Sequence, residues 1–135
     1  MKTLDVVAAI LERDGKILLA QRPAHRDQPG MWELAGGKVE PDESQPQALM
    51  RELREELGIE AVVGQYVASH QREVSGRMIH LHAWHVPTYQ GELHAHEHQQ
   101  LVWCSPEEAL EYPLAPADIP LLQAFILLRD ARPAD

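Results

Sequence analysis

Two short apolar runs open the chain, Leu4–Leu11 and Lys16–Gln21, and both are rich in aliphatic and β-branched residues. Asp14 and Gly15 stand between them, a pair that tolerates the left-handed backbone of a tight hairpin turn. The pattern therefore predicts two paired strands. Similar runs predict three further strands, at Val62–His70, Arg77–Val86 and Gln100–Cys104.

A helix is predicted between Ser44 and Gly58. Ser44 has the spacing from Gln47 that a capping box needs, and a glycine suits the left-handed residue that ends a helix. The segment between the two caps holds about 13 residues. Just before it, "MWELAGGKV" is a short apolar piece with two glycines, which we expect to enter a functional site edge-on.

Two more helices are predicted towards the C-terminus. Ser105 and Glu108 form a second capping box, which predicts a short helix. Asp118 followed by Pro120 predicts the start of a last helix, with apolar positions at Leu121, Leu122, Phe125, Ile126 and Leu128. The order β-β-α-β-β-β-α-α is typical of a mixed α/β sandwich, and 135 residues suit one domain spanning 1–135.

The charge balance limits the class of partner. A net charge of −9 argues against binding of a nucleic-acid polymer or an anionic membrane, since both partners need a basic face. A small anionic substrate fits if a cation bridges it to the protein. The single Cys104 forms no internal disulfide, and the chain shows neither a signal peptide nor a membrane-length apolar run. We expect a cytoplasmic protein, a monomer or a small homo-oligomer.

The predicted first helix concentrates negative charge. At helical spacing Glu52, Glu55 and Glu56 share one face, beside an apolar stripe of leucines. Like charges at this spacing repel, so divalent cations would relieve the cost. Carboxylate oxygens suit Mg²⁺, with Mn²⁺ as a possible substitute. The alternative is an ordinary solvated acidic helix face.

The spacing around these glutamates decides between the two. Gly37, Glu43 and the run "RELREELGI" beginning at Arg51 match every fixed position of the Nudix box, so the chain resembles the Nudix hydrolase family. The resemblance implies an α/β fold, the Nudix α/β/α sandwich with a mixed sheet. It also implies hydrolysis of a nucleoside diphosphate linked to another group.

The resemblance also implies roles for single residues. Six residues are expected to hold the metal: Gly36 and Gly37 through their backbone, and Glu52, Glu55, Glu56 and, outside the box, Glu97 through their side chains. Glu43 is expected to support the helix, and Arg51 to orient glutamates by ion pairing. A general base must take a proton from the attacking water. Glu52, Glu55 and Glu97 all remain candidates, with Glu55 and Glu97 favoured.

Beyond the box, "VVAAILERDGKILLAQRP", "WELAGGKVEPDESQ" and "LAPADIPLL" resemble the bacterial MutT-type subgroup, and within it enzymes that act on CTP, dCTP, 5-methyl-dCTP and 5-hydroxy-dCTP. The implied reaction releases the monophosphate and pyrophosphate and cleanses the nucleotide pool. The expected substrate-binding residues are Arg22, Leu34, Ala35, Gly36, Gly37, Lys38, Val39, Arg72, Arg77 and Asp118.

Asp118 stands where a guanine-specific relative of this subgroup has asparagine. An ionised aspartate only accepts hydrogen bonds, so it suits a base with an amino donor, such as cytosine at N4. The alternative is that Asp118 caps the last helix.

Other functions and other roles for single residues are compatible with parts of the sequence. The substrate could be ADP-ribose, NADH or a nucleotide sugar, or the chain could be a nucleotide sensor without activity, although its box glutamates are complete. His80 and His82, or the tract His94, His96 and His98, could bind Zn²⁺, but no convincing fourth ligand is evident, so a polar lining is expected. Three tryptophans, Trp32, Trp84 and Trp103, are expected in the core or a pocket wall.

Overall fold

The computed structural model describes residues 2–131. Met1 and residues 132–135, which the predicted domain includes, lie outside the described residues. The strands are β1 (Lys2–Arg13), β2 (Lys16–Gln21), β3 (Trp32–Glu33), β4 (Gly36–Lys38), β5 (Glu60–Val62), β6 (Tyr66–Val74), β7 (Arg77–Val86), β8 (Thr88–Gln90) and β9 (Gln100–Cys104). The helices are α1 (Gln45–Leu57), α2 (Pro106–Ala109) and α3 (Asp118–Asp130).

Over the described residues, seven strands form one mixed sheet with the central order β3-β2-β1-β7-β6. β4 pairs with β1, and β9 pairs with β2. The long strands β1 and β7 run parallel, from Lys2 opposite Arg77 to Leu11 opposite Val86, whereas the neighbouring pairs are antiparallel. β5 and β8 make a separate two-stranded sheet. The predicted α/β class with a mixed sheet is confirmed.

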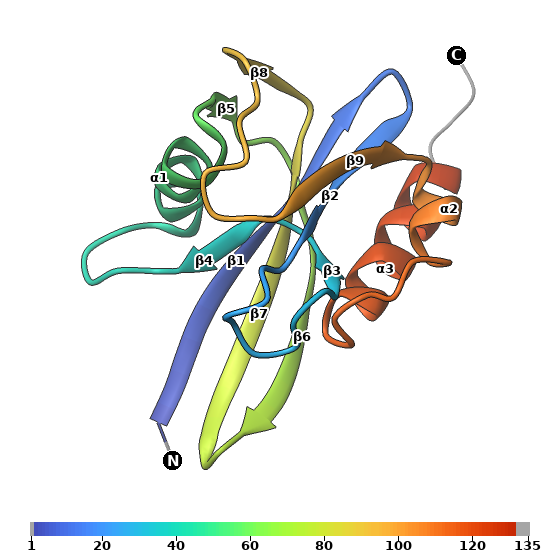
Figure 1. Cartoon of the computed structure of the whole chain (residues 1–135). Helices are drawn as coiled ribbons and strands as arrows, with labels where there is room; N and C mark the ends of the chain where they lie inside the picture. The colour runs from blue at the N-terminus through green and yellow to red at the C-terminus, as the bar shows by residue number, and fades with distance from the viewer. Residues whose placement is uncertain (1, 132–135) are drawn as a thin grey trace.

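Helices cover both faces of the sheet, as Figure 1 shows. On one face α1 packs its fully buried Leu49, Leu53 and Leu57 against alternate residues of β1. On the other face α3 packs Leu121 and Phe125. Because successive side chains of a strand point to opposite faces, β1 supplies both cores at once. The structure is the predicted sandwich.

The predicted turn between β1 and β2 and the predicted caps of α1 are confirmed. Asp14 and Gly15 have φ values of 54° and 79°, as a hairpin turn between β1 and β2 requires. Ser44 and Gln47 form the capping box of α1, which ends at Gly58 with φ 72°. Each of these signals is local, so the sequence alone locates it.

The prediction of one strand at Val62–His70 is wrong, because the chain breaks at Gly64 into β5 and β6. The Gly64 N–H donates a hydrogen bond of 2.7 Å to the carbonyl of His85. A Cβ at this position would lie 3.0 Å from Pro87 Cδ. The segment therefore turns away from the main sheet, and β5 pairs with β8, a strand that the pattern did not predict.

Asp118 does not cap α3, so that part of the prediction is also wrong. The N-cap is Ala117, and no side chain makes a capping hydrogen bond. Asp118 already lies in the helix, because its N–H donates to the carbonyl of Ala115 at 3.0 Å, and only 5% of its surface is exposed. Its carboxyl group makes no capping hydrogen bond to the helix terminus that it was expected to cap.

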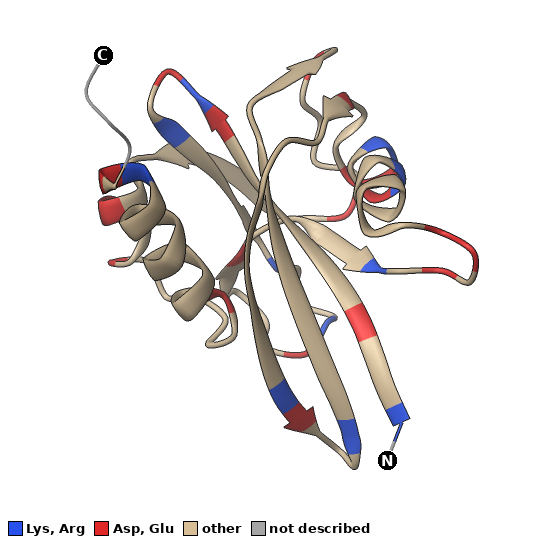
Figure 2. Cartoon of the chain, turned by 180° about the vertical axis from the view of Figure 1, so that it is seen from behind, with Lys and Arg blue, Asp and Glu red and all other residues tan. Residues whose placement is uncertain are grey.

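Charge is unevenly distributed over the ribbon. Figure 2 shows acidic and basic residues together on α1 and acidic residues on the loop that leads into it, while most of the sheet carries neither. Within residues 2–131, no helix is both long and apolar enough to cross a membrane.

Candidate active site

The three glutamates of α1 differ sharply in exposure. The Glu56 side chain is 6% exposed and that of Glu52 is 16% exposed, whereas the Glu55 side chain is 57% exposed. They lie at neighbouring positions because residues three and four apart share a helix face. One face of α1 therefore carries two enclosed carboxyl groups and one that solvent reaches.

Arg51 holds the acidic face in place. Its guanidinium donates two hydrogen bonds to Glu43, of 2.7 and 2.9 Å, and one of 3.0 Å to Glu52. It also donates to the carbonyl of Lys38 at 3.0 Å and lies 3.5 Å from Glu55. A planar fork of donors suits such a set of partners. Arg51 thus joins α1, its preceding loop and β4, as expected of a residue that orients glutamates.

Two glycines let α1 and β1 approach β4 closely. A Cβ at Gly37 would lie 2.4 Å from the carboxyl carbon of Glu52. A Cβ at Gly36 would lie 1.9 Å from the carbonyl oxygen of Val7. The Glu52 carboxyl group therefore rests directly on the backbone of β4, and this arrangement needs glycine at both positions.

Burial raises the pKa of Glu56 to about 10, together with a hydrogen bond to Glu52 and the negative charges of Glu33 and Glu97. Enclosed carboxylates repel one another in a low dielectric, so one of them keeps a proton unless a cation takes its place. Oxygen ligands in this number suit Mg²⁺. The donor set fits the expected metal.

A second cluster, which the sequence did not indicate, lies beside Glu56. Glu33 accepts a hydrogen bond from Arg22 Nη1 at 2.5 Å and pairs with His98 Nε2 at 2.9 Å. The same His98 nitrogen lies 3.8 Å from Glu56. Burial alone would raise the pKa of Glu33, but His98 and Arg22 outweigh it and the pKa is lowered. Glu33 is thus held ionised between two positive or donating groups.

The only hint of these residues in the sequence was indirect. Glu33 stands inside the segment that was expected to enter the site, and His98 belongs to the histidine tract that was interpreted as polar lining. Arg22 was expected to contact substrate. In the structure its Nε and Nη2 bind Asp27, and its Nη1 binds Glu33.

A cavity of about 370 Å³ lies next to these groups, over the α3 side of the sheet. Its lining includes the predicted substrate residues Arg22, Leu34, Gly36, Gly37, Lys38 and Asp118. The volume is within the range of small-ligand sites. Burial, and next the charge of Glu33, raises the pKa of Asp118 well above its usual range, although Arg22 opposes this. A proton is therefore favoured on the Asp118 carboxyl group.

The remaining predicted residues do not line this cavity. Arg72 lines an adjacent hollow that shares Ile79 and Leu81 with the cavity. Arg77 is exposed at the start of β7. Two others pack in the core on the α1 side, Ala35 and Val39, and Glu97 lies in an exposed loop close enough to affect the Glu56 pKa.

Known proteins resemble this chain in sequence and in fold. A family model described as NUDIX domain matches residues 1–125. The chain belongs to the Nudix family. This Nudix hydrolase is 82% identical over 135 residues to the CTP pyrophosphohydrolase of Escherichia coli strain K12, with both chains covered in full. It is 38% identical over 116 residues to the putative 8-oxo-dGTP diphosphatase 2 of Mycobacterium tuberculosis strain H37Rv, covering 84% of this chain and 81% of that one.

Solved structures of similar proteins have the same fold as this chain. The solution structure of the Escherichia coli ORF135 protein matches this Nudix hydrolase with a TM-score of 0.92 and 81% identity, over 100% of this chain and 96% of that one. The MutT Nudix hydrolase of Burkholderia pseudomallei matches with a TM-score of 0.80 and 28% identity, over 92% and 98%. The resemblance to MutT-type Nudix hydrolases is confirmed.

Proposed function

We propose that this enzyme hydrolyses cytosine nucleoside triphosphates, CTP and dCTP with C5-modified dCTP among them, to the monophosphate and pyrophosphate in the cytoplasmic nucleotide pool. The observation that carries the proposal is the contact between the acidic face of α1 and the wall of the cavity. Glu52 of α1 rests on Gly37, and Gly37 lines the same cavity as the buried Asp118. Metal-binding carboxylates and a base-sized polar pocket are therefore contiguous. The 82% identical relative named CTP pyrophosphohydrolase supports the choice of substrate.

Four carboxylates would hold the metal in this proposal, Glu52, Glu55, Glu56 and Glu97, with the backbone of Gly36 and Gly37 beside them. Bound Mg²⁺, or Mn²⁺ in its place, would neutralise phosphate charge and make a water acidic enough to attack phosphorus. It also explains how a protein of net charge −9 accepts an anionic substrate.

The chain's own residues have distinct roles. Arg51 keeps Glu52 against β4, and the ammonium group of Lys38, which lines the cavity, binds the phosphates. A general base must reach water, and Glu55 and Glu97 are exposed. Glu56 and its neighbour His98 are enclosed, so they position the carboxylate face instead.

Asp118 provides base selection through its protonation state. An ionised side chain was expected from the sequence, whereas the raised pKa of Asp118 favours the neutral acid. A neutral carboxyl group has one donor and one acceptor, which match N3 and the N4 amino group of cytosine. With its donor directed at N3, the same orientation would place donor against donor for uracil, which has N3–H.

The decisive experiment measures products and preference together. In Mg²⁺ buffer, CTP should give CMP and pyrophosphate, and kcat/KM for CTP or dCTP should exceed that for UTP or dUTP by roughly 10- to 100-fold, because mismatched buried polar groups are costly. The same assay with 5-methyl-dCTP tests whether the enzyme accepts a methyl group at C5 of the base. No turnover of any nucleoside triphosphate, or turnover of ADP-ribose in preference, would refute the assignment.

Variants of Asp118 test the base contact. Asp118→Ala should lose most activity on CTP and narrow the ratio of CTP to UTP. Asp118→Asn keeps a donor and an acceptor, so it should retain the preference if the native group is neutral and lose it if the native group is ionised. An unchanged ratio in Asp118→Ala would show that this residue does not read the base.

A further inference from the structure

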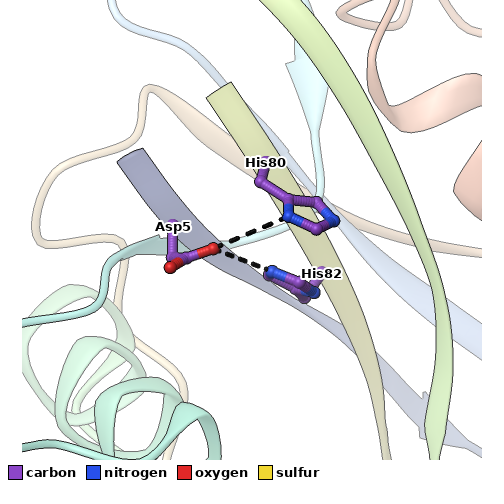
Figure 3. Close-up of side chains that lie close together, drawn as sticks. All are labelled: Asp5, His80 and His82. Carbon is purple, nitrogen blue, oxygen red and sulfur yellow. Dashed lines mark hydrogen bonds and ion pairs between the residues drawn. The ribbon is translucent and has the colours of Figure 1, made fainter. Parts of the chain in front are cut away.

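The face of the sheet opposite the nucleotide cavity carries a cluster that the proposed activity does not use. His80 and His82 alternate along β7, and Asp5 of β1 lies opposite His80 in the parallel pairing. Figure 3 shows both rings directed toward the Asp5 carboxyl group. Asp5 Oδ1 lies 3.1 Å from His82 Nε2 and 3.8 Å from His80 Nδ1. All three potential ligand atoms lie within 4.8 Å of one another.

We propose that Asp5, His80 and His82 bind a divalent transition-metal ion such as Zn²⁺, at a site separate from the carboxylates of α1. Zinc bonds to imidazole nitrogen and carboxylate oxygen at about 2.0 to 2.2 Å, so tetrahedral ligand atoms lie roughly 3.3 Å apart. The three atoms need only small side-chain rotations to reach that spacing. Two imidazoles and one carboxylate favour zinc, nickel or cobalt over Mg²⁺, which prefers oxygen ligands.

The outer contacts suit a metal ligand. His82 Nδ1 lies 2.9 Å from the hydroxyl of Tyr66 on β6. A metal on Nε2 requires the proton on Nδ1, and there the ring donates to the tyrosine oxygen, which fixes its tautomer and orientation. Tyr66 also packs edge-on against Trp84, with ring centroids 5.1 Å apart. The ring of His82 is therefore held between Tyr66 and Asp5, with Nε2 hydrogen-bonded to the Asp5 carboxyl group that would share the ion.

Access to the site is open on one side. The His82 side chain is 9% exposed, that of His80 25% and that of Asp5 51%. An ion can enter past Asp5, and water can complete its coordination, as at three-ligand zinc sites. The parallel pairing of β1 and β7 supplied the third ligand that the sequence pattern lacked, since Asp5 lies 75 or more positions away from the histidines in the chain.

An ion at this site would connect β1 to β7 beneath the nucleotide cavity. Leu4 and Val6 of β1, with Ile79 and Leu81 of β7, line that cavity from the other face of the same two strands. Because successive side chains alternate between faces, the ion and the nucleotide would lie on opposite sides of one sheet. The ion would stabilise the fold and hold the cavity floor without taking part in the reaction.

The test is Zn²⁺ binding by the metal-stripped full chain, with Mg²⁺ in excess to compete for the α1 carboxylates. Calorimetry should show one tight Zn²⁺ equivalent, and long-range nitrogen NMR should show shifts of the His80 and His82 rings. Zn²⁺ should also raise the melting temperature. Co²⁺ should give the visible absorption of nitrogen-ligated cobalt.

Three variants remove one ligand each: Asp5→Asn, His80→Ala and His82→Ala. Each should weaken Zn²⁺ binding by at least about 10-fold. The matched control replaces the exposed pair His94 and His96 by alanine, which should leave binding unchanged. NMR of the unmutated protein keeps the test valid if a variant fails to fold. Absence of a tight Zn²⁺ equivalent, or shifts at His94 and His96 instead, would overturn the proposal. The result is independent of the nucleotide assignment.

Discussion

At the scale of single residues, two adjacent glutamates in one helical turn have opposite environments. Glu55 is exposed and 3.5 Å from Arg51, while Glu56 is enclosed, with its pKa raised to about 10. A cation is the simplest group that lowers the free energy of the enclosed pair of Glu52 and Glu56. The carboxyl group of Glu55 is exposed, so a water molecule can reach it. Position on the helix, rather than residue type, therefore separates a structural ligand from a candidate base.

Replacing Glu55 or Glu56 by glutamine removes charge while keeping size. We expect kcat in Mg²⁺ to fall at least about 100-fold in each variant, since each loses a charged ligand or base. Steady-state assays and a thermal melt would separate lost activity from lost folding. Glu60→Gln is the matched control, because Glu60 is exposed and pairs with Arg54 away from this face. Turnover close to wild type in both site variants would contradict the metal-site assignment.

At the scale of elements, the site depends on how closely β4 approaches its two neighbours. Gly36 lies against the Val7 carbonyl of β1, and Gly37 lies against the Glu52 carboxyl group of α1. The first contact is with backbone in a paired strand, which cannot move independently. The second is with the end of a flexible side chain. Gly36 is therefore needed for the pairing of β4 with β1, and Gly37 is needed for the position of the Glu52 carboxyl group.

Alanine at each glycine should separate stability from activity. Gly36→Ala should destabilise the protein by about 1 to 3 kcal/mol, because the added methyl group overlaps the backbone of β1. Gly37→Ala should leave the unfolding free energy nearly unchanged but lower kcat, because Glu52 must move. Urea unfolding and steady-state kinetics on both variants test this. Full activity in Gly37→Ala would show that the Glu52 position is not critical.

The elements that could be predicted are those with local signals. The capping box at Ser44, the C-terminal Gly58 and the Asp14-Gly15 turn each act within a few residues, and the acidic helix face followed from spacing alone. The break at Gly64 depends on a hydrogen bond to His85, which is distant in the chain. The sequence around Gly64 does not indicate a hydrogen-bond partner that is so distant in the chain.

The same reasoning explains the site residues that were missed. Glu33 gains its role from Arg22 and His98, which lie 11 and 65 positions away in the chain. Asp118 was expected to be ionised, either reading the base or capping the last helix, because a sequence carries no information on burial. Its pKa became interpretable only when the cavity and Glu33 were placed around it.

At the scale of the whole molecule, the sheet separates two sets of polar groups. The cavity lined by Asp118 lies on the α3 side, while Asp5 and its histidines lie on the α1 side. Buried carboxyl groups are costly to ionise, and this fold encloses two with raised pKa values, Glu56 and Asp118. Both must lower the stability of the metal-free protein as pH rises. Enclosing these two carboxyl groups therefore costs folding stability at neutral pH.

The last prediction concerns how the free energy of unfolding depends on pH when a chelator keeps the protein free of metal. Asp118 has an ordinary pKa of 3.8 and a raised one when folded, so above about pH 4 the folded state binds more protons than the unfolded state and unfolding free energy falls with pH. Glu33, with a lowered pKa, acts in the opposite sense, but only at pH values below its ordinary pKa of 4.5.

Urea unfolding at about pH 5 and about pH 8 should therefore show wild type losing more stability than Asp118→Asn, which has no proton to release. Excess Mg²⁺ should reduce the loss that comes from Glu56, because the cation replaces its proton, but should leave the difference between wild type and Asp118→Asn in place. Parallel losses in the two proteins would mean that Asp118 is ionised in the folded state. The neutral-acid account of cytosine selection would then fail with it, whereas the carboxylate face of α1 would be unaffected.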